Sequence, residues 1–154
     1  MPQNRKYQTQ WASQFYAAAE LTRRGYLVTL TFGNAKFTDL MVETPSGKVL
    51  FIDVKGHFGK NWWIIRPPEP NENRYFILVY IPKNENEAPT YSIFSSIEMS
   101  EELERSKEEC EQANKKRIED GKKGFKEWAP GMGGMAWSQP LKPDYKDRWD
   151  KFRK

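Results

Sequence analysis

Two aspartates and a lysine lie inside the apolar segment FTDLMVETPSGKVLFIDVKG, residues 37–56. Asp39 belongs to the run before the turn sequence TPSG, and Asp53 and Lys55 belong to the run after it. Carboxylates from two strands can hold a divalent cation, and an ammonium group beside them can orient a water or stabilise developing negative charge. These three residues are therefore the first candidates for a catalytic site.

The spacing of the three charges indicates how a hairpin would arrange them. Side chains of a strand alternate between the faces of a sheet, so all three charges can occupy a single face. A three-residue turn at residues 45–47 pairs residues whose numbers sum to 92, which puts Asp39 directly opposite Asp53. Their Cβ atoms would then be roughly 4.5–5.5 Å apart. A two-residue turn would shift the pairing by one, so this expectation depends on the turn type.

Two opposed carboxylates need a compensating cation. Burying such a pair costs several kcal/mol by order of magnitude, and Lys55 offsets only one charge. Mg²⁺ favours one or two carboxylates together with phosphate oxygens, and it would polarise a scissile phosphate and acidify a water that Lys55 could orient or deprotonate. This apparatus suits phosphodiester hydrolysis. The alternative is that the two aspartates are solvated on an exposed sheet face with Lys55 as a surface partner.

The elements around this hairpin predict one α+β, or mixed α/β, domain. The chain has 154 residues and 38% apolar content, enough for one core. Residues 10–24 are rich in helix formers, and four side chains fall on one face of that helix: Trp11, Phe15, Ala18 and Thr22. Strands are expected at 26–32, 39–44, 48–55, 62–66, 74–81 and 90–97, with loop at 56–63 leading into the fourth.

The C-terminal third is expected to be less regular. Met99-Ser100-Glu101-Glu102 is typical of a helix cap, and a charged helix should follow over about residues 100–120. The tail, 121–154, is loop-rich, with PGMGGMAW interpreted as a flexible loop and a short helix at the end. Trp149 and Phe152 should anchor the C-terminus onto the core. The whole chain, 1–154, is thus expected to be one domain with its core at about 8–100.

Composition limits the classes of function only loosely. The net charge of +4 suits a polyanionic partner, a property that many unrelated proteins share. Cys110 is the only cysteine, so neither an internal disulfide nor a CxxC zinc motif is available. No apolar run is long enough to span a membrane, and no secretory signal is visible. We therefore expect a cytoplasmic protein with no membrane partner.

The hairpin resembles the core of the PD-(D/E)XK nuclease superfamily, which has the restriction-endonuclease-like fold. Its pattern is an Asp on one strand and (D/E)-x-K on the next, here Asp39 and Asp53-Val54-Lys55. The preceding ELTRRGYLVTLTFGNAKFTD and the later WWIIR, RYFILVYI and YSIFSS are similar to an uncharacterised prokaryotic branch. The resemblance covers about residues 8–100 and, more loosely, the KDRWDKF tail. It implies an αβββαβ core with a central mixed sheet and flanking helices, Mg²⁺ dependence with Mn²⁺ as a substitute, and cleavage of nucleic acid, DNA rather than RNA.

The resemblance also draws attention to the first helix. The family commonly carries a metal-supporting Glu there, and that position in this sequence is Gln14. Glu20 lies about 240° around the helix from Gln14, so both cannot face the site. We expect Gln14 to face it and Glu20 to pair with Arg24 at i+4 on the surface. A neutral amide lacks the charge of a carboxylate, so a weak nuclease, or one retained only for binding, is the alternative.

Residues after the second hairpin strand mix basic and aromatic side chains. The candidates for nucleic-acid contact are His57, Lys60, Trp62, Trp63 and Arg66. His57 can instead be a solvent-facing loop residue, and at least one of the adjacent tryptophans should belong to the core. Gly56 either allows close approach of a substrate or ends the strand.

The sequence thus predicts a Mg²⁺-dependent nuclease in which Asp39 and Asp53 bind the metal, Lys55 positions or activates water and Gln14 assists. Nucleases of this fold often dimerise, so a homodimer is a further expectation. Two other hypotheses remain open. One is a nuclease-like domain that binds nucleic acid or a protein without catalysis, and the other is a structural α+β protein whose hairpin charges are solvated.

Overall fold

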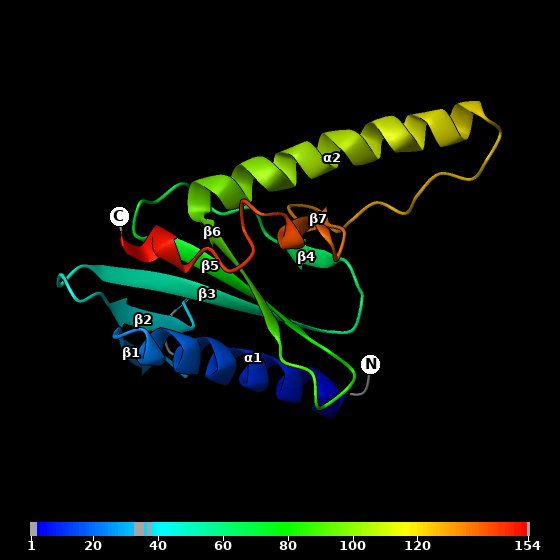
Figure 1. Ribbon diagram of the computed structural model, residues 1–154. Coiled ribbons are helices and arrows are strands. Elements are labelled where there is room, and N and C mark those ends of the chain that lie inside the picture. Colours follow the sequence, from blue (N-terminus) through cyan, green and yellow to red (C-terminus); the bar gives the residue numbers. More distant parts are fainter. Residues whose placement is uncertain (1–2, 33–35, 37, 154) are drawn as a thin grey trace.

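The fold is built on a five-stranded mixed sheet, seen in a computed structural model that describes residues 3–32, 36 and 38–153 (Figure 1). The strand order is β1-β2-β3-β5-β6, and the only parallel neighbours in that order are β3 and β5. A separate two-stranded sheet pairs β4 with β7. The strands are β1 (Leu27–Leu30), β2 (Leu40–Glu43), β3 (Val49–Phe58), β4 (Trp63–Ile65), β5 (Arg74–Ile81), β6 (Thr90–Ser95) and β7 (Gly133–Met135). The predicted mixed α+β class is confirmed.

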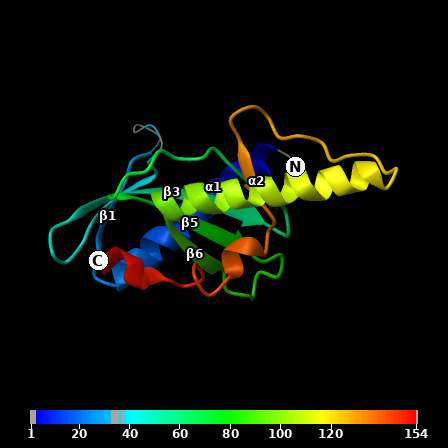
Figure 2. The ribbon, with the colours of Figure 1, turned by 90° about the horizontal axis from the view of Figure 1, so that it is seen from above.

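Two helices lie on opposite faces of the central sheet (Figures 1 and 2). Helix α1 (Gln3–Arg23) covers one face, and α2 (Ser96–Glu119) covers the other together with the β4–β7 sheet. Each interface holds its own core cluster of buried apolar side chains. The chain ends with two short 3-10 helices, η1 (Gln139–Leu141) and η2 (Trp149–Arg153). The candidate site lies where α1 approaches β3, beside the N-terminal end of β2.

Helix α1 packs through a different face from the one its aromatic residues suggest. Ala17 and Leu21 are fully buried, whereas Trp11 and Phe15 are exposed. The helix approaches the sheet closely because Gly56 of β3 has no side chain: a Cβ there would lie 1.8 Å from Ser13 Oγ. Gly56 therefore neither ends the strand nor meets a substrate on this face, because the buried Ser13 fills the space above it.

Strand β3 is longer than expected. The loop predicted from residue 56 is wrong at residues 56–58, which continue β3 and pair with residues 79–81 of β5. Parallel pairing with β5 satisfies their backbone groups, so the glycine does not break the strand. The interpretation of PGMGGMAW as a flexible loop is also wrong, because Gly133–Met135 forms β7 and pairs with β4. Gly134 faces Trp128 so closely that a Cβ would lie 2.6 Å from its ring.

Helix α2 begins earlier than the predicted cap at residues 99–102. Its N-cap is Ser95, whose side chain accepts from the Glu98 backbone N–H, while the Glu98 side chain accepts from the Ser95 N–H. This reciprocal capping box satisfies two otherwise free donors. The buried residues of α2 end at Ser106, and the rest of the helix projects beyond the sheet (Figure 1).

The connection from β3 to β5 departs from the αβββαβ order that the resemblance implies. Residues 59–73, all of which the structure describes, contain β4 and no helix. Pro67, Pro68 and Pro70 in this segment oppose helix formation, because proline lacks the backbone N–H that a helix needs. The covering helix of this face is instead α2, which follows β6.

The C-terminal residues pack onto the core as predicted. Trp149 and Phe152 are buried against the α1-side cluster, where Phe152 meets Tyr26 and Tyr75 in edge-to-face contacts. The short helix expected at the end of the chain is η2. None of the helices in the described part of the chain is long and apolar enough to cross a membrane.

Candidate active site

The β2–β3 hairpin has the predicted register up to its last pair. Thr44 and Lys48 close a three-residue turn through a backbone hydrogen bond of 2.8 Å, and Gly47 adopts the positive φ of 86° that such a turn requires. Leu40 pairs with Ile52, as the sum of 92 demands. The hairpin thus brings the N-terminal end of β2 to the middle of β3, where Asp53 and Lys55 lie.

The register changes at Asp39. Its backbone N–H donates to Ile52 O at 2.9 Å, although Ile52 is already the partner of Leu40. Two residues opposite one is the pattern of a β-bulge, which redirects the extra side chain. Asp39 is consequently not directly opposite Asp53, so the expected pairing of these two residues is wrong.

The Asp39 carboxylate lies at the edge of β3, beyond the end of β2. Its Oδ2 accepts from the Val54 backbone N–H at 2.8 Å, and its Oδ1 accepts from Gln14 Nε2 of α1 at 3.1 Å. Burial raises the pKa of the Asp39 carboxyl, while the Val54 N–H and the Lys55 ammonium lower it and the Asp53 charge raises it further. The carboxyl therefore holds its proton more tightly than a solvated aspartate, although it feels both other charges of the motif.

Asp53 is buried, with 4% of its surface exposed, and it has two cationic partners. Arg74 Nη2 lies 2.6 Å from Asp53 Oδ2, and Lys55 Nζ lies 3.6 Å from Asp53 Oδ1. Asp53 and Lys55 alternate with the α1-facing Ile52 and Val54, so they occupy the opposite face of β3. The predicted lysine–aspartate proximity is present, and the sequence reasoning missed Arg74.

Helix α1 contributes the residue expected from it. Gln14 is buried and contacts Asp39, whereas Glu20 accepts hydrogen bonds from Arg24 on another side of the helix. Gln14 therefore links α1 to the candidate carboxylates, and Glu20 does not reach them. The side assignment made from helical geometry is correct.

The aromatic residues beyond the motif divide between core and surface. His57 lies in β3, not in a loop, and packs against the Trp63 ring with centroids 4.2 Å apart. Its Nε2 lies 2.7 Å from Trp62 O, and burial lowers its pKa while this hydrogen bond raises it. Trp63 is 3% exposed and belongs to the α2-side core, whereas Trp62 is 46% exposed. One tryptophan is thus structural, as expected.

Lys60 and Arg66 are exposed, and both follow the end of β3 in the sequence. Lys60 lines a hollow of about 520 Å³ at the carboxyl ends of β3 and β5, with Lys83 and Tyr80 among the other lining residues. Its Nζ lies 4.7 Å from the Trp137 ring centroid. Arg66 follows β4, on the smaller sheet. The five candidate nucleic-acid contacts are therefore divided among β3, the hollow at the carboxyl ends of β3 and β5, and the segment around β4.

The donor set at the motif has the chemistry that Mg²⁺ prefers. The amide of Gln14 comes from α1, and the carboxylates of Asp39 and Asp53 come from the start of β2 and from β3. All three side chains offer oxygen. Each carboxylate oxygen keeps a second lone pair after accepting its present hydrogen bond, so ligation does not require every contact to break. Among the described residues, groups of three or more His, Cys, Asp or Glu side chains suited to a metal are absent, which is consistent with a motif of only two acids.

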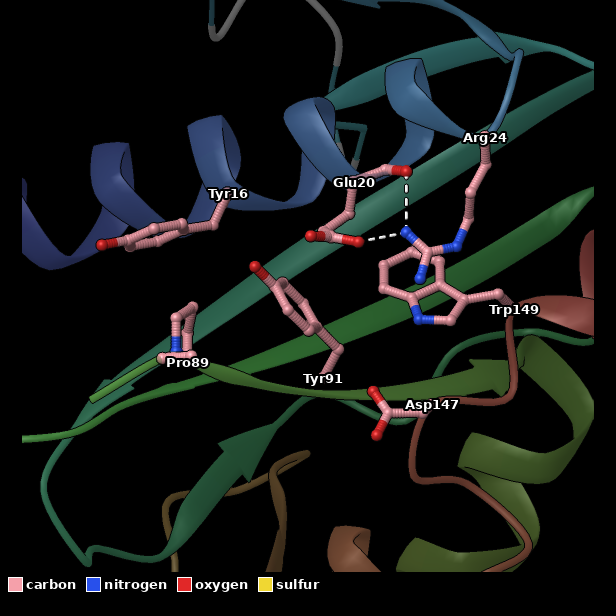
Figure 3. A pocket seen from close by; sticks show the side chains of 8 residues that line it. Tyr16, Glu20, Arg24, Pro89, Tyr91, Asp147 and Trp149 are labelled. Carbon is pink, nitrogen blue, oxygen red and sulfur yellow. Dashed lines mark hydrogen bonds and ion pairs between the residues drawn. The ribbon is translucent and has the colours of Figure 1, made fainter. Parts of the chain in front are cut away.

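A cavity of about 360 Å³ lies between α1 and β6, away from the motif (Figure 3). Arg24 stacks over the Trp149 ring at 4.3 Å and pairs with Glu20, and Tyr91 contacts Trp149 at 5.3 Å between centroids. Burial, with the nearby Glu20 charge, raises the pKa of Tyr91 to about 12, so its hydroxyl stays neutral. These contacts hold the C-terminal segment against α1, so the residues that line the cavity have a structural role.

Comparison of the chain with protein-family models, with curated proteins and with solved structures gave no match. The function is therefore inferred from the residues and their geometry.

Proposed function

We propose that this protein is a metal-dependent nuclease that hydrolyses phosphodiester bonds, with DNA as the substrate. The observation that carries the proposal is the chain of contacts from Gln14 to Asp39 and on to the Val54 N–H, between Asp53 and Lys55. It joins the first helix, the lone Asp and the D-x-K strand at one point. A solvated surface aspartate would not need two buried partners from separate elements.

The arrangement of elements supports a restriction-endonuclease-like core. A helix precedes three antiparallel strands, β1, β2 and β3, and β3 then pairs in parallel with β5. The absence of a helix between β3 and β5 is a departure from the αβββαβ order. Asp39 directly precedes β2 and Asp53 lies in the neighbouring β3, an arrangement that supports the proposed motif.

Each residue has a role in the proposed reaction. Asp39 and Asp53 would hold Mg²⁺, or Mn²⁺ in its place, and the ion would supply Lewis acidity toward the scissile phosphate. Gln14 fixes the orientation of Asp39 through its amide N–H. Lys55, whose side chain is 42% exposed, can orient the attacking water and place a positive charge where negative charge develops.

Charge balance supplies the argument for a second candidate, a nuclease-like domain that binds nucleic acid without cutting it. Arg74 and Lys55 already give Asp53 two cationic partners, and Gln14 replaces a carboxylate that would add negative charge. A metal must therefore compete with Arg74 for Asp53. A cytoplasmic location and a homodimer belong to the nuclease proposal.

The test combines metal binding with cleavage. Mg²⁺ or Mn²⁺ should raise the melting temperature of the wild type and not that of Asp53→Asn, which keeps the size of the side chain. Plasmid or single-stranded DNA should be cut by the wild type and by Lys107→Ala, an exposed lysine on α2, and not by Lys55→Ala. Metal binding without cleavage would favour the binding-only domain, and no metal response at all would refute the metal site.

A further inference from the structure

Three large aromatic side chains form an exposed cluster beside the candidate active site. Trp11 and Phe15, one helical turn apart on α1, stack with ring centroids 5.7 Å apart, and Phe32 lies 5.9 Å from Trp11. Their exposed fractions are 36%, 56% and 65%, respectively. Trp11 therefore contacts both phenylalanine rings, and the three rings, named here the aromatic platform, still present faces or edges to solvent.

The backbone that carries Phe32 is held in an unusual conformation. Its φ is 51°, a left-handed value that is uncommon for a bulky residue and costs free energy. The preceding Thr31 is fixed twice, because its N–H donates to Asp39 O at 3.0 Å and its hydroxyl donates to Thr38 O at 2.6 Å. The chain thus turns an aromatic ring outward at a point anchored to the residue that carries the candidate carboxylate.

The platform and the site share the same two supports. On α1, Gln14 lies between Trp11 and Phe15 in sequence and about 60° around the helix from Trp11. On the sheet, Thr31 bonds Asp39, and Phe32 follows directly. A polymer whose phosphate lies at Asp39 would therefore have its neighbouring residues next to the rings.

We propose that the aromatic platform stacks unpaired nucleobases, so that the substrate is single-stranded nucleic acid or a strand with unpaired nucleotides. The inference depends on the proposed function for the position of the phosphate. Every base has a π-face, and stacking on protein aromatic rings does not require a particular sequence. A duplex keeps its bases stacked inside, which leaves the platform no base to accept. The chain's net charge of +4 favours a polyanion over a cationic or neutral apolar partner.

The test measures binding without cleavage, in EDTA, by fluorescence anisotropy of a labelled 20-nucleotide oligothymidine, a mixed-sequence 20-base-pair duplex and an abasic strand of equal length. Trp11→Ala and Phe15→Ala should weaken binding of the oligothymidine about tenfold each, since one stacked base contributes about that factor or more. Binding of the duplex and of the abasic strand should change less than twofold. Phe125→Ala, an exposed ring on the segment after α2, is the matched control and should change nothing.

The outcomes separate this inference from the nuclease proposal. Loss of single-strand affinity in the platform variants supports stacking even when no strand is cut, because the assay contains no metal. Equal losses for oligothymidine and abasic strand, or no loss, overturn it. If Trp11→Ala instead abolishes self-association in size-exclusion chromatography and leaves DNA affinity intact, the rings are a contact between two copies and the stacking proposal is wrong.

Discussion

Arg74 Nη2 lies 2.6 Å from Asp53 Oδ2, and the two residues belong to the parallel strands β5 and β3. Arg74 pairs with Phe51 in the parallel register, which places it two residue pairs from Asp53. The guanidinium thus supplies the positive charge that a buried carboxylate requires. Any cation that binds Asp53 has to share it with this side chain.

Replacing Arg74 should therefore separate stability from metal binding. Arg74→Ala should lower the free energy of unfolding by about 3 kcal/mol, because it leaves a buried carboxylate with only the half-exposed Lys55 as partner. Mg²⁺ should then stabilise the variant more than the wild type, since the competitor is gone. Urea unfolding with and without Mg²⁺ measures both effects.

Arg66→Ala, which removes an exposed arginine on β4's flank, is the matched control and should change stability by less than about 0.5 kcal/mol. Equal metal stabilisation in Arg74→Ala and in the wild type would show that Asp53 is not a metal ligand. A variant that loses no stability would show that Lys55 alone compensates the charge.

A carboxylate at position 14 should destabilise the protein without metal and stabilise it with metal. Gln14→Glu places an acid 3.1 Å from where Asp39 Oδ1 now accepts a hydrogen bond. In EDTA the like charges should cost about 1 kcal/mol of stability and raise the Asp39 pKa further. With Mg²⁺ the extra carboxylate becomes a favourable partner, so this variant should show a larger rise in melting temperature and faster cleavage than the wild type.

Glu20→Gln, on the same helix but paired with Arg24, should leave the metal response unchanged. The prediction for position 14 fails if Gln14→Glu is less stable than the wild type by the same amount in EDTA and in Mg²⁺. That result would mean that no cation enters between the two side chains.

Several of these relationships could be read from the sequence, because they depend on local rules. The three-residue turn at 45–47 set the register of β2 and β3, and 100° per residue placed Gln14 and Glu20 on different sides of α1. Alternation likewise separated Trp62 from Trp63. Each of these rules involves only neighbours in the chain.

Other relationships depend on contacts that local rules do not contain. The Asp53–Arg74 pair joins residues 21 apart in sequence, and it needs the parallel register of β3 and β5. The bulge at Asp39 needs the backbone bonds to both Ile52 and Thr31. β7 lies in a glycine-rich segment that has no strand propensity, and it forms because β4 provides its partner.

The close approach of α1 to β3 also depends on such a contact, and it can be tested at Gly56. Gly56→Ala would put a Cβ 1.8 Å from Ser13 Oγ and 2.8 Å from Ser13 Cβ. Overpacking of this kind should cost about 1–3 kcal/mol and move Gln14 away from Asp39. The melting temperature and the cleavage rate of Gly56→Ala should therefore both be lower than those of the wild type.

The second-site variant Ser13→Gly removes both Ser13 atoms, leaving the Thr9 carbonyl oxygen at 3.1 Å, and should restore much of the lost stability in the double mutant, beyond additivity. Ser13→Ala removes Oγ alone and keeps the Cβ contact, so it should restore less. Additive effects of Gly56→Ala and Ser13→Gly would show that the two residues do not limit the packing of α1.

His57 is the only histidine in the chain, so its titration can be followed without overlap. Burial against Trp63 lowers its pKa, and the hydrogen bond with Trp62 O opposes that shift without cancelling it. The imidazole is consequently neutral at pH 7. This weakens its predicted role as a cationic phosphate contact and favours a structural role between β3 and β4.

The ring C–H signals of His57 in NMR should therefore titrate with a midpoint below 6.5. As pH falls through 6.5, the unfolded state takes up the proton first, so the free energy of unfolding should decrease until pH reaches the lower folded-state value, and this contribution should then stay constant. His57→Gln should remove that part of the pH dependence while leaving the carboxylate-linked part at lower pH. A midpoint at or above 6.5 would mean that a nearby negative charge outweighs burial, and bound phosphate would then become a reasonable partner for His57.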